Sequence, residues 1–414
     1  MAGVYLSFPF CAQKCTFCNF ASGVFPRDLE QRYLAALETD LAGYAWPWQP
    51  ETVYLGGGSP NRIPPPALRV LLDRIPFRPW REATIEATPG AVTPELARAW
   101  RDAGIDRVSL GVQSFVQAEI AATGRKHTAA RVLEEVALLR DAALSNFNID
   151  LIAGLPGQTP ATWSESLDWI ERLAAPHVSV YMLEVDEDSR LGAEILRGGS
   201  RYGAPKAPPD DLVADLYETA VDRLDALGIP RYEISNFARP GFESRHNLKY
   251  WTLEPYAAFG ADAHAFDGVL RRANVESPEE YVDRIERGLS PCAAIEPAHP
   301  AEERFFVGLR LTAGIRPDPE DWTRFEAPIR RFVESGLLEI VSRPAPAAGA
   351  DTALRLSPAA PGRVGQAVPP ARATEPRPSG SGPAALLETA TPTLRLTRRG
   401  VLLSNEIFQE FLES

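Results

Sequence analysis

Segments with the pattern of β-strands and segments with the pattern of α-helices alternate through the first half of this 414-residue chain. The expected strands are short apolar, β-branched or aromatic runs, and they cover residues 4–7, 52–55, 83–87, 107–111, 147–152 and 177–183. The expected helices lie between them, at residues 27–42, 66–74, 93–103, 129–143 and 162–174. Six such strand–helix units indicate parallel strands with helices outside. The sequence therefore predicts an α/β fold, either a doubly wound sheet or a partial (β/α)6 TIM-like barrel.

The rest of the chain differs in composition. Residues 231–299 contain a segment dense in aromatics and His, and a smaller helical domain is expected from about residue 300. Residues 345–392 are rich in Pro, Ala and Gly with little apolar content, which is typical of a disordered insertion. The segments GLLEIV before it and LRLT after it are expected to pair as a winged-helix-like hairpin. We expect a barrel at 1–230, a middle segment and linker at 231–299, and a small C-terminal α+β domain at 300–414.

Charge and hydropathy exclude several kinds of partner. A formal net charge of −12 argues against non-specific binding to nucleic acid or to an anionic membrane surface. No apolar run approaches the roughly 20 residues that span a bilayer, and no signal-peptide pattern precedes the first cysteine. We expect a cytoplasmic protein without a transmembrane segment. Four cysteines, with Cys292 far from the other three, make a poor disulfide framework and favour a metal site.

Three of the cysteines stand close together in FCAQKCTFCNF, directly after the first expected strand. Cys11, Cys15 and Cys18 are separated by three residues and then by two. A structural zinc site usually takes four ligands in two close pairs, and a thioredoxin-like motif at Cys15 and Cys18 leaves Cys11 unexplained. A [4Fe–4S] cluster normally takes four cysteines, so three would leave one iron open to another ligand.

Each expected strand ends near a residue that is unusual for an apolar core. Because ligands of barrel-like α/β folds bind at the carboxyl ends of the strands, these residues are candidates for one site. They are Tyr5, the turn Gly57, Gly58 and Ser59, and then Glu86, Gln113, Arg125, Asp150 and Glu184. Taken singly, a glycine-rich stretch can be only a tight turn, and Glu86 or Asp150 can be a helix cap or a salt-bridge partner. Their recurrence at successive strand ends favours a shared ligand site.

The cysteine spacing after the first strand strongly resembles that of the radical S-adenosylmethionine (SAM) superfamily. The resemblance implies a [4Fe–4S] cluster on the three cysteines, with SAM chelating the open iron. It further implies that Gly57, Gly58 and Ser59 contact the methionyl amino group of SAM. In the same way, Glu86 and Gln113 would contact the methionyl and ribose portions, Arg125 the carboxylate and Asp150 the ribose. Tyr5 and Glu184 would complete the SAM site.

Longer motifs narrow the resemblance. The segments GGGSP, GVQSF, DLIAGLPGQT and EISNFARPG, in this order, are similar to the oxygen-independent coproporphyrinogen III oxidase family. The final LTRRGVLLSNEIFQEFL resembles that family's C-terminal domain. Dehydrogenases of the family carry a further cysteine two residues after the third, and Phe20 stands there in this chain. They also carry an N-terminal extension, whereas ten residues precede Cys11. These two departures place the resemblance closest to the heme chaperone branch, HemW.

That branch has a His-Asn-x-x-Tyr-Trp motif, present here as HNLKYW from His246 to Trp251. The resemblance implies that His246, Tyr250 and Trp251 contact heme, because imidazole is a common axial ligand and aromatic rings can stack on a macrocycle. The alternative is a histidine packed in an aromatic-rich core. His264 is the second candidate ligand. The other histidines, His127, His177 and His299, are expected at the surface or in caps.

Two functions follow from the resemblance. The first is a heme chaperone that binds a [4Fe–4S] cluster, SAM and heme and delivers heme to acceptor proteins, including membrane respiratory enzymes. In that case SAM and the cluster would support transfer or formation of a homodimer. The alternative is an enzyme that converts coproporphyrinogen III to protoporphyrinogen IX. A radical SAM enzyme acting on RNA or another metabolite is a third reading, which the acidic charge disfavours.

Overall fold

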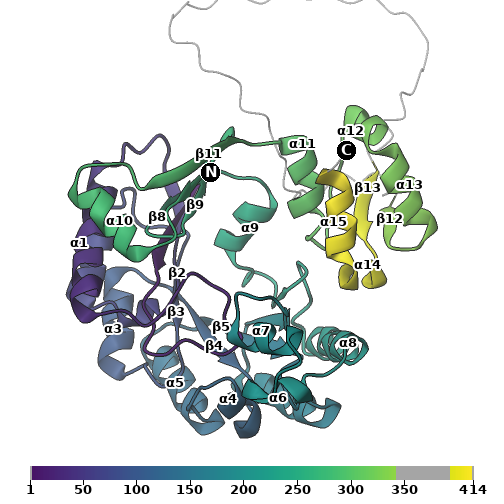
Figure 1. Cartoon of the computed structure of the whole chain (residues 1–414), viewed down its shortest axis with the longest axis horizontal. Coiled ribbons are helices and arrows are strands. Elements are labelled where there is room, and N and C mark those ends of the chain that lie inside the picture. The colour runs from purple at the N-terminus through teal and green to yellow at the C-terminus, as the bar shows by residue number, and fades with distance from the viewer. Residues whose placement is uncertain (1, 342–391, 413–414) are drawn as a thin grey trace, which may run out of the picture.

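A single large sheet organises most of the chain in the computed structural model, which describes residues 2–341 and 392–412 (Figure 1). Its strand order is β11-β10-β9-β8-β1-β2-β3-β4-β5-β6-β7, and β1 to β6 run parallel. The strands are β1 (Ala2–Phe8), β2 (Pro50–Gly57), β3 (Glu82–Ala87), β4 (Arg107–Gln113), β5 (Asn146–Ala153), β6 (His177–Met182), β7 (Asn236–Ala238), β8 (Tyr256–Phe259), β9 (His264–Phe266), β10 (Leu270–Asn274) and β11 (Cys292–Pro297). The predicted α/β fold with a partial (β/α)6 barrel is confirmed, since the six predicted strands are β1 to β6.

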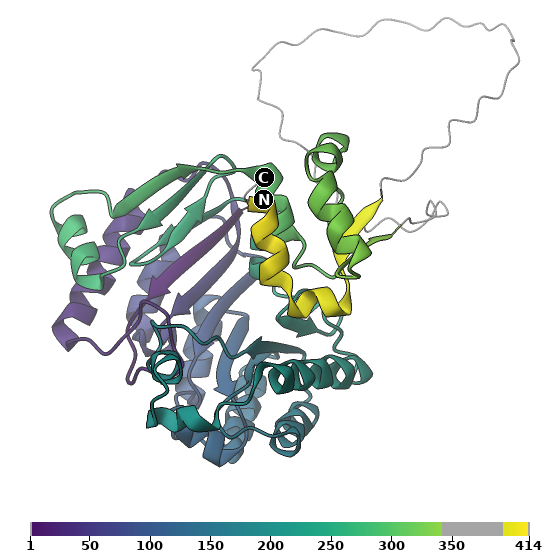
Figure 2. The same ribbon diagram turned by 45° about the vertical axis from the view of Figure 1, so that its right-hand side comes forward.

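Helices alternate with these strands, and most of them surround the curved sheet on its outer side, whereas α9 lies on its inner side (Figures 1 and 2). They are α1 (Arg27–Gly43), α2 (Pro65–Asp73), α3 (Pro94–Ala103), α4 (Gln117–Ala122), α5 (Ala129–Asp141), α6 (Pro160–Leu173), α7 (Arg190–Leu196), α8 (Asp210–Ala226), α9 (Arg245–Trp251) and α10 (Pro278–Glu286). The local sequence explains where α3 begins. Thr93 accepts a hydrogen bond from Leu96 N at the start of this helix, and Pro94 follows it in the first turn. The short helix α4 was not predicted from the sequence.

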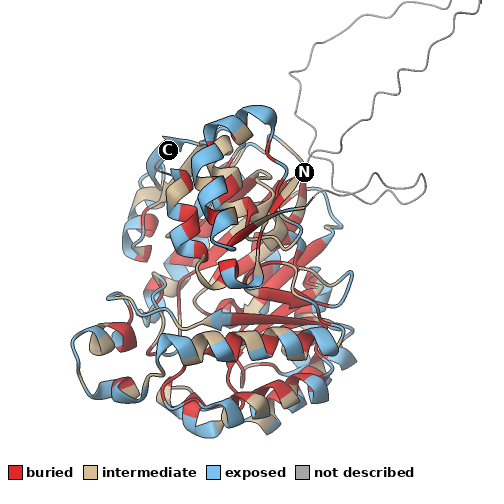
Figure 3. Cartoon of the chain, turned by 90° about the vertical axis from the view of Figure 1, so that its right-hand side faces the viewer, coloured by how far each residue is buried: buried red, intermediate tan, exposed pale blue. Residues whose placement is uncertain are grey.

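The two faces of the parallel strands have opposite character. Apolar residues at alternate positions, such as Val4, Leu6 and Phe8 on β1, are at most 1% exposed and pack under the helices (Figure 3). The intervening residues point to the inner side of the barrel, here called the lumen, because side chains alternate along a strand. Strand register places Tyr5 beside Tyr54 in this lumen. Barrel interiors are usually filled by branched apolar residues, whereas this lumen is largely polar.

The segment 231–299 is part of the sheet and is not a linker. β8 pairs in parallel with β1, and β9, β10 and β11 extend the sheet beyond it as antiparallel strands. Helix α10 is joined to α1 by an ion pair of 2.7 Å between Arg32 and Glu286. The sequence missed these strands because they are short, and β9, β10 and β11 are also only partly buried. The prediction that this segment contacts heme concerns ligand binding and does not depend on its place in the sheet.

The C-terminal region is a small α+β unit. Its elements are α11 (Pro300–Glu303), a π-helix (Arg304–Gly308), α12 (Pro319–Arg324), α13 (Glu326–Glu334), β12 (Leu338–Val341), β13 (Thr393–Leu396), α14 (Arg398–Leu402) and α15 (Ser404–Leu412). The predicted hairpin is present, since β12 and β13 are antiparallel with Leu338 opposite Leu396. Apart from Pro392, the insertion predicted at 345–392 lies outside the described residues. None of the described helices is long and apolar enough to cross a bilayer.

Candidate functional site

The three clustered cysteines lie in the loop that joins β1 to α1, at the carboxyl end of the first strand. All three are free and partly exposed. Three contacts hold this loop: Gln13 Nε2 donates to Gly124 O at 2.6 Å, Thr16 N donates to Thr123 O at 3.2 Å, and Leu191 N donates to Thr16 O at 2.8 Å. The loop is therefore fixed between the segment after β4 and the start of α7.

The cysteine sulfurs lie near enough to affect one another's ionisation. Burial raises the pKa of the Cys11 thiol, hydrogen bonds with Ser22 and Ser59 lower it, and the charges of Cys18 and Cys15 raise it. Within the part of the chain that the structure describes, no group of three or more His, Cys, Asp or Glu side chains converges on one metal ion. Cluster ligation differs, because each thiolate binds its own iron. The donor set of three free thiols in one loop therefore fits an iron–sulfur cluster better than a zinc ion.

The glycine turn after β2 packs directly against the cysteine loop. A Cβ atom on Gly58 would lie 2.7 Å from Pro9 C and 2.9 Å from Phe10 O, so only glycine fits this approach. Gly57 has a φ of 105°, in the left-handed region that favours glycine. Ser59 N donates to Phe10 O at 3.0 Å. The turn is therefore tight and lies directly beside the cysteine loop. Its contact with SAM stays a prediction.

Two carboxylates from β3 and β5, the strands on either side of β4, lie in the same part of the lumen. Glu86 on β3 accepts a hydrogen bond from Tyr54 Oη at 2.9 Å, and Asp150 on β5 accepts from Asn148 Nδ2 at 2.6 Å. Burial and the charge of Asp150 raise the pKa of Glu86 to about 7, although the bond from Tyr54 lowers it. Burial raises the pKa of Asp150 as well. Ser109 Oγ also donates to Asp150 at 3.3 Å, and the charge of Arg107 lowers the pKa of Asp150 against the effect of burial.

Arg125 connects the end of β4 to the cysteine loop. Its guanidinium donates to Gly111 O and, from Nε, to Cys15 Sγ at 3.1 Å. Gln113 ends β4 with a φ of 72°, and a Cβ on Gly111 would lie 3.1 Å from Gln113 Nε2. These side chains therefore gather beside the cysteine loop at the end of one strand.

Tyr5 and Glu184 complete the residues predicted for SAM. The Tyr5 ring stacks on Tyr54 with centroids 6.2 Å apart, and burial raises its pKa. Glu184 is exposed in the loop after β6. The structure thus brings most of the predicted SAM residues to the carboxyl half of the parallel strands, on the side where the cysteine loop lies, whereas Tyr5 lies in the middle of β1 beside Tyr54. Their contact with SAM stays a prediction.

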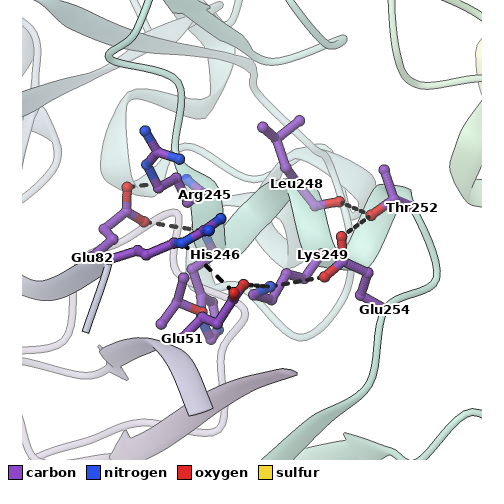
Figure 4. Close-up of polar contacts among 10 residues, drawn as sticks. Glu51, Glu82, Arg245, His246, Leu248, Lys249, Thr252 and Glu254 are labelled. Atoms are coloured by element: carbon purple, nitrogen blue, oxygen red, sulfur yellow. Dashed lines mark hydrogen bonds and ion pairs between the residues drawn. The ribbon is translucent and has the colours of Figure 1, made fainter. Parts of the chain in front are cut away.

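The residues predicted to contact heme lie at the opposite ends of the strands. Helix α9 carries them, and Glu82, the first residue of β3, accepts bonds of 3.0 Å from the backbone N–H groups of Arg245 and His246 (Figure 4). A Cβ on Gly3, near the start of β1, would lie 3.0 Å from His246 Cε1. Glu82 and Glu86 on β3 are four residues apart, or about 13 Å along an extended strand. Tyr54 connects the two groups, because its hydroxyl donates to Glu86 and its ring stacks on the His246 ring with centroids 5.3 Å apart.

His246 has the environment of a histidine packed in a core. The side chain is fully buried, and its Nδ1 and Nε2 atoms lie 2.8 Å from Thr52 Oγ1 and Tyr250 Oη. Burial, with the charges of Lys249 and Arg107, lowers its pKa to about 3. Both ring nitrogens are occupied, so an axial bond to heme iron would require this helix to release one of these partners. The alternative that the sequence left open therefore matches this conformation, and iron ligation stays a prediction.

The remaining heme candidates differ in exposure. Trp251 is partly buried, and the Arg310 guanidinium lies 4.4 Å from the centre of its ring. His264, the second candidate ligand, is 67% exposed on β9 and lies 3.9 Å from Asp262. Among the histidines expected at the surface, His127 and His177 are instead buried. That expectation was wrong for these two residues.

Several polar residues of the lumen were not identified from the sequence. They are Thr52, Tyr54, Glu82, Arg107, Ser109, Asn148, His177, Ser179 and Tyr232. A signal was present, since polar residues alternate with apolar ones in RVSLG, NIDL and HVSVY. An alternating strand with a polar side is usually solvent-exposed on that side, so the pattern gave no sign of a buried network.

Comparison with known proteins agrees with this geometry. Residues 5–170 match the family model of the Radical SAM superfamily. The chain is 34% identical over 326 residues to the heme chaperone HemW of Bacillus subtilis, covering 76% of this chain and 85% of that protein. It is 35% identical over 308 residues to the heme chaperone HemW of Mycobacterium tuberculosis, covering 71% and 77%. Among solved structures, coproporphyrinogen III oxidase (HemN) from Escherichia coli has a TM-score of 0.74 at 16% identity, covering 99% and 89%.

The cysteine loop, the parallel barrel strands and the matched family model define a protein of the radical SAM class. The chain belongs to the HemW branch of the oxygen-independent coproporphyrinogen III oxidase-like family within that superfamily. The likeness to the solved oxidase concerns the fold.

Proposed function

We propose that this protein is a heme chaperone that binds a [4Fe–4S] cluster, SAM and heme and transfers heme to acceptor proteins. The observation that carries this proposal is its similarity to proteins named heme chaperones over about three quarters of its length. Phe20 supports the same function, because the family's dehydrogenases have a cysteine at that position. Membrane respiratory enzymes are the proposed acceptors, the cytoplasm is the proposed compartment, and a homodimer is the proposed assembly.

The residues at the carboxyl ends of the strands would hold the two cofactors. Cys11, Cys15 and Cys18 would bind three irons, and the cluster, when bound, supplies an electron to SAM at the fourth. Arg125 would pair with the SAM carboxylate, because its guanidinium already lies 3.1 Å from Cys15 Sγ. Asp150 would accept hydrogen bonds from the ribose hydroxyls.

Three further contacts are proposed for SAM. The turn of Gly57, Gly58 and Ser59 would receive the methionyl amino group. Glu86 and Gln113 would contact the methionyl and ribose portions, and Tyr5 and Glu184 would border the site. The two carboxylates in the lumen suit a ligand that carries a sulfonium and an ammonium group.

The heme site is proposed in the middle segment, 231–299, whose strands β7 to β11 belong to the main sheet. His246, Tyr250 and Trp251 would contact heme once α9 rearranges, because His246 is fully buried in the described conformation. His264 is the exposed alternative ligand.

Coproporphyrinogen III dehydrogenation is the second candidate, favoured by the likeness of the fold to the solved oxidase. One experiment separates the two functions. Anaerobically reconstituted protein, SAM and a reductant are incubated with coproporphyrinogen III, and heme is titrated in parallel. The chaperone proposal predicts saturable heme binding, heme transfer to an apo acceptor and no protoporphyrinogen. Protoporphyrinogen formed together with 5′-deoxyadenosine would overturn it.

A further inference from the structure

A buried chain of hydrogen bonds links the SAM-site carboxylate Asp150 to helix α9. Asn148 Nδ2 lies 2.6 Å from Asp150 Oδ1, and Asn148 Oδ1 lies 2.7 Å from His177 Nδ1. His177 Nε2 lies 2.9 Å from Tyr232 Oη, which in turn lies 3.1 Å from the backbone nitrogen of Ser244, the N-cap of α9. The chain therefore runs from the middle of β5 to the start of α9.

The chemistry of its two ends fixes the direction of every bond. An ionised carboxylate only accepts, so the amide nitrogen of Asn148 must face Asp150 and its oxygen must face His177. His177 then carries its proton on Nδ1, which leaves Nε2 to accept from the Tyr232 hydroxyl. That hydroxyl oxygen accepts in turn from Ser244 N–H, which can only donate. All donors of the chain thus point toward Asp150.

The surroundings of His177 keep the imidazole neutral and in place. The side chain is fully buried, and burial together with the charge of Arg107 holds its pKa well below the usual range. Asn148 is also braced by Ser109 at 2.8 Å and Ser179 at 3.0 Å. The Tyr232 ring meets the imidazole edge-on with centroids 5.6 Å apart. The network therefore allows one tautomer of His177 and one orientation of Asn148.

We propose that His177 is a positioning residue that sets the orientation of Asp150 for the ribose of SAM, acting through Asn148. Its Nδ1–H holds the Asn148 amide so that the nitrogen faces the carboxylate. Without this donor, Asn148 can turn its oxygen toward Asp150 and repel it. Through Tyr232, the same imidazole ties the SAM site to the start of α9. This inference rests on the proposed function, because it takes SAM as the ligand of Asp150.

The test compares two substitutions at one position. His177→Phe keeps an aromatic ring but removes both nitrogens, whereas His177→Asn retains a donor near the Nδ1 position. Equilibrium dialysis of SAM against the cluster-loaded proteins is expected to give a Kd raised about tenfold by His177→Phe. His177→Asn is expected to restore the affinity to within about threefold of the unchanged protein. Iron content and the cluster absorbance are expected to be the same in all three proteins.

A matched control and an independent measurement keep the proposal falsifiable. Thr84→Val changes a buried hydroxyl on β3 that has no partner among the described residues, so SAM affinity is expected to stay unchanged. In unliganded protein labelled with 15N-histidine, the nitrogen shifts of His177 are expected to show a proton on Nδ1. An Nε2–H tautomer, an imidazolium, or equal SAM affinity in His177→Phe would overturn the proposal. If the unchanged protein bound no SAM, the proposed function would fail instead, and the tautomer would still test the chain.

Discussion

Arg125 donates a hydrogen bond from Nε to Cys15 Sγ at 3.1 Å, which brings a permanent cation to the edge of the cysteine loop. The same guanidinium holds the carbonyl of Gly111 on β4. The contact therefore ties the loop after β1 to the fourth strand.

Replacing Arg125 by Met is expected to weaken SAM binding at least about tenfold, because a charge-assisted hydrogen bond is worth about 1.5–3 kcal/mol. Iron content is expected to stay the same, since the cysteines provide the ligands. SAM affinity is measured by dialysis on the reconstituted protein. Lys126→Met, which removes the exposed cation next along the chain, serves as the matched control. Equal effects of the two substitutions would refute a direct role for Arg125.

Gly58→Ala is expected to lower the free energy of unfolding by about 1–3 kcal/mol and to reduce iron incorporation, because overpacking forces the backbone apart. The added methyl would lie 2.7 Å from Pro9 C, in the segment that leads into the cysteine loop. Urea unfolding and iron analysis measure the two effects. Gly43→Ala is the control, since nothing lies within 4 Å of a Cβ there. A Gly58→Ala protein with unchanged unfolding free energy and full iron content would contradict this prediction, because the turn would then accommodate the methyl group.

The carboxyl of Glu86 makes stability depend on pH near neutrality. Burial and the Asp150 charge raise its pKa from 4.5 to about 7 in the folded protein. Between these two values the folded state binds the proton more tightly, so the stabilisation is complete below pH 4.5 and is lost as pH rises through 7. The Glu86→Gln substitution removes this pH-dependent stabilisation. The difference in unfolding free energy between the unchanged protein and the variant is expected to fall from pH 5 to pH 8, and a constant difference would contradict it.

His246→Ala tests the packed histidine and the heme ligand at the same time. Removing a fully buried ring that is bonded to Thr52 and Tyr250 is expected to cost about 2–4 kcal/mol of stability. His264→Ala, at an exposed position, is expected to cost about 0.5 kcal/mol or less. Thermal unfolding gives these values and heme titration gives the affinities. Unchanged heme affinity in His246→Ala would remove the ligand assignment and leave the chaperone function untouched.

Shortening the C-terminal hairpin tests whether the predicted insertion has a part in the fold. Val341 and Thr393 are paired at the open end of β12 and β13, so an Asn-Gly turn can replace residues 342–392. Cluster and SAM binding are expected to be unchanged, and stability to rise by up to about 3 kcal/mol, because closing a shorter loop costs less conformational entropy. Iron analysis and urea unfolding provide the measurements. Loss of the cluster would show that this segment contributes to the cofactor site.

The barrel strands and the family could be predicted because their signals are local. Six buried strands left apolar runs in the sequence, and the three cysteines lie within eight residues of one another. Residues at successive strand ends were expected to meet because parallel strands share a carboxyl edge, and the structure places Glu86 and Asp150 there.

The position of α9 could not be predicted in the same way. The sequence gave HNLKYW as a motif, but the end of the barrel at which it lies depends on Glu82 and Gly3, more than 150 positions earlier. The strands β8 to β11 were missed for a related reason, because strands of three to six residues leave too short a pattern to recognise. The burial of His177 depends on Tyr232 and Asn148, which are distant in sequence as well.

In most barrels the same side chains stabilise the fold and line the interior, whereas in this barrel different side chains do so. Apolar residues such as Val4, Leu6 and Ile85 hold the strands to the outer helices, while the inward side is joined by hydrogen bonds. Evolution can therefore change the inward residues of such a barrel, and with them the molecules it accepts, while the hydrophobic contacts that keep it folded stay intact.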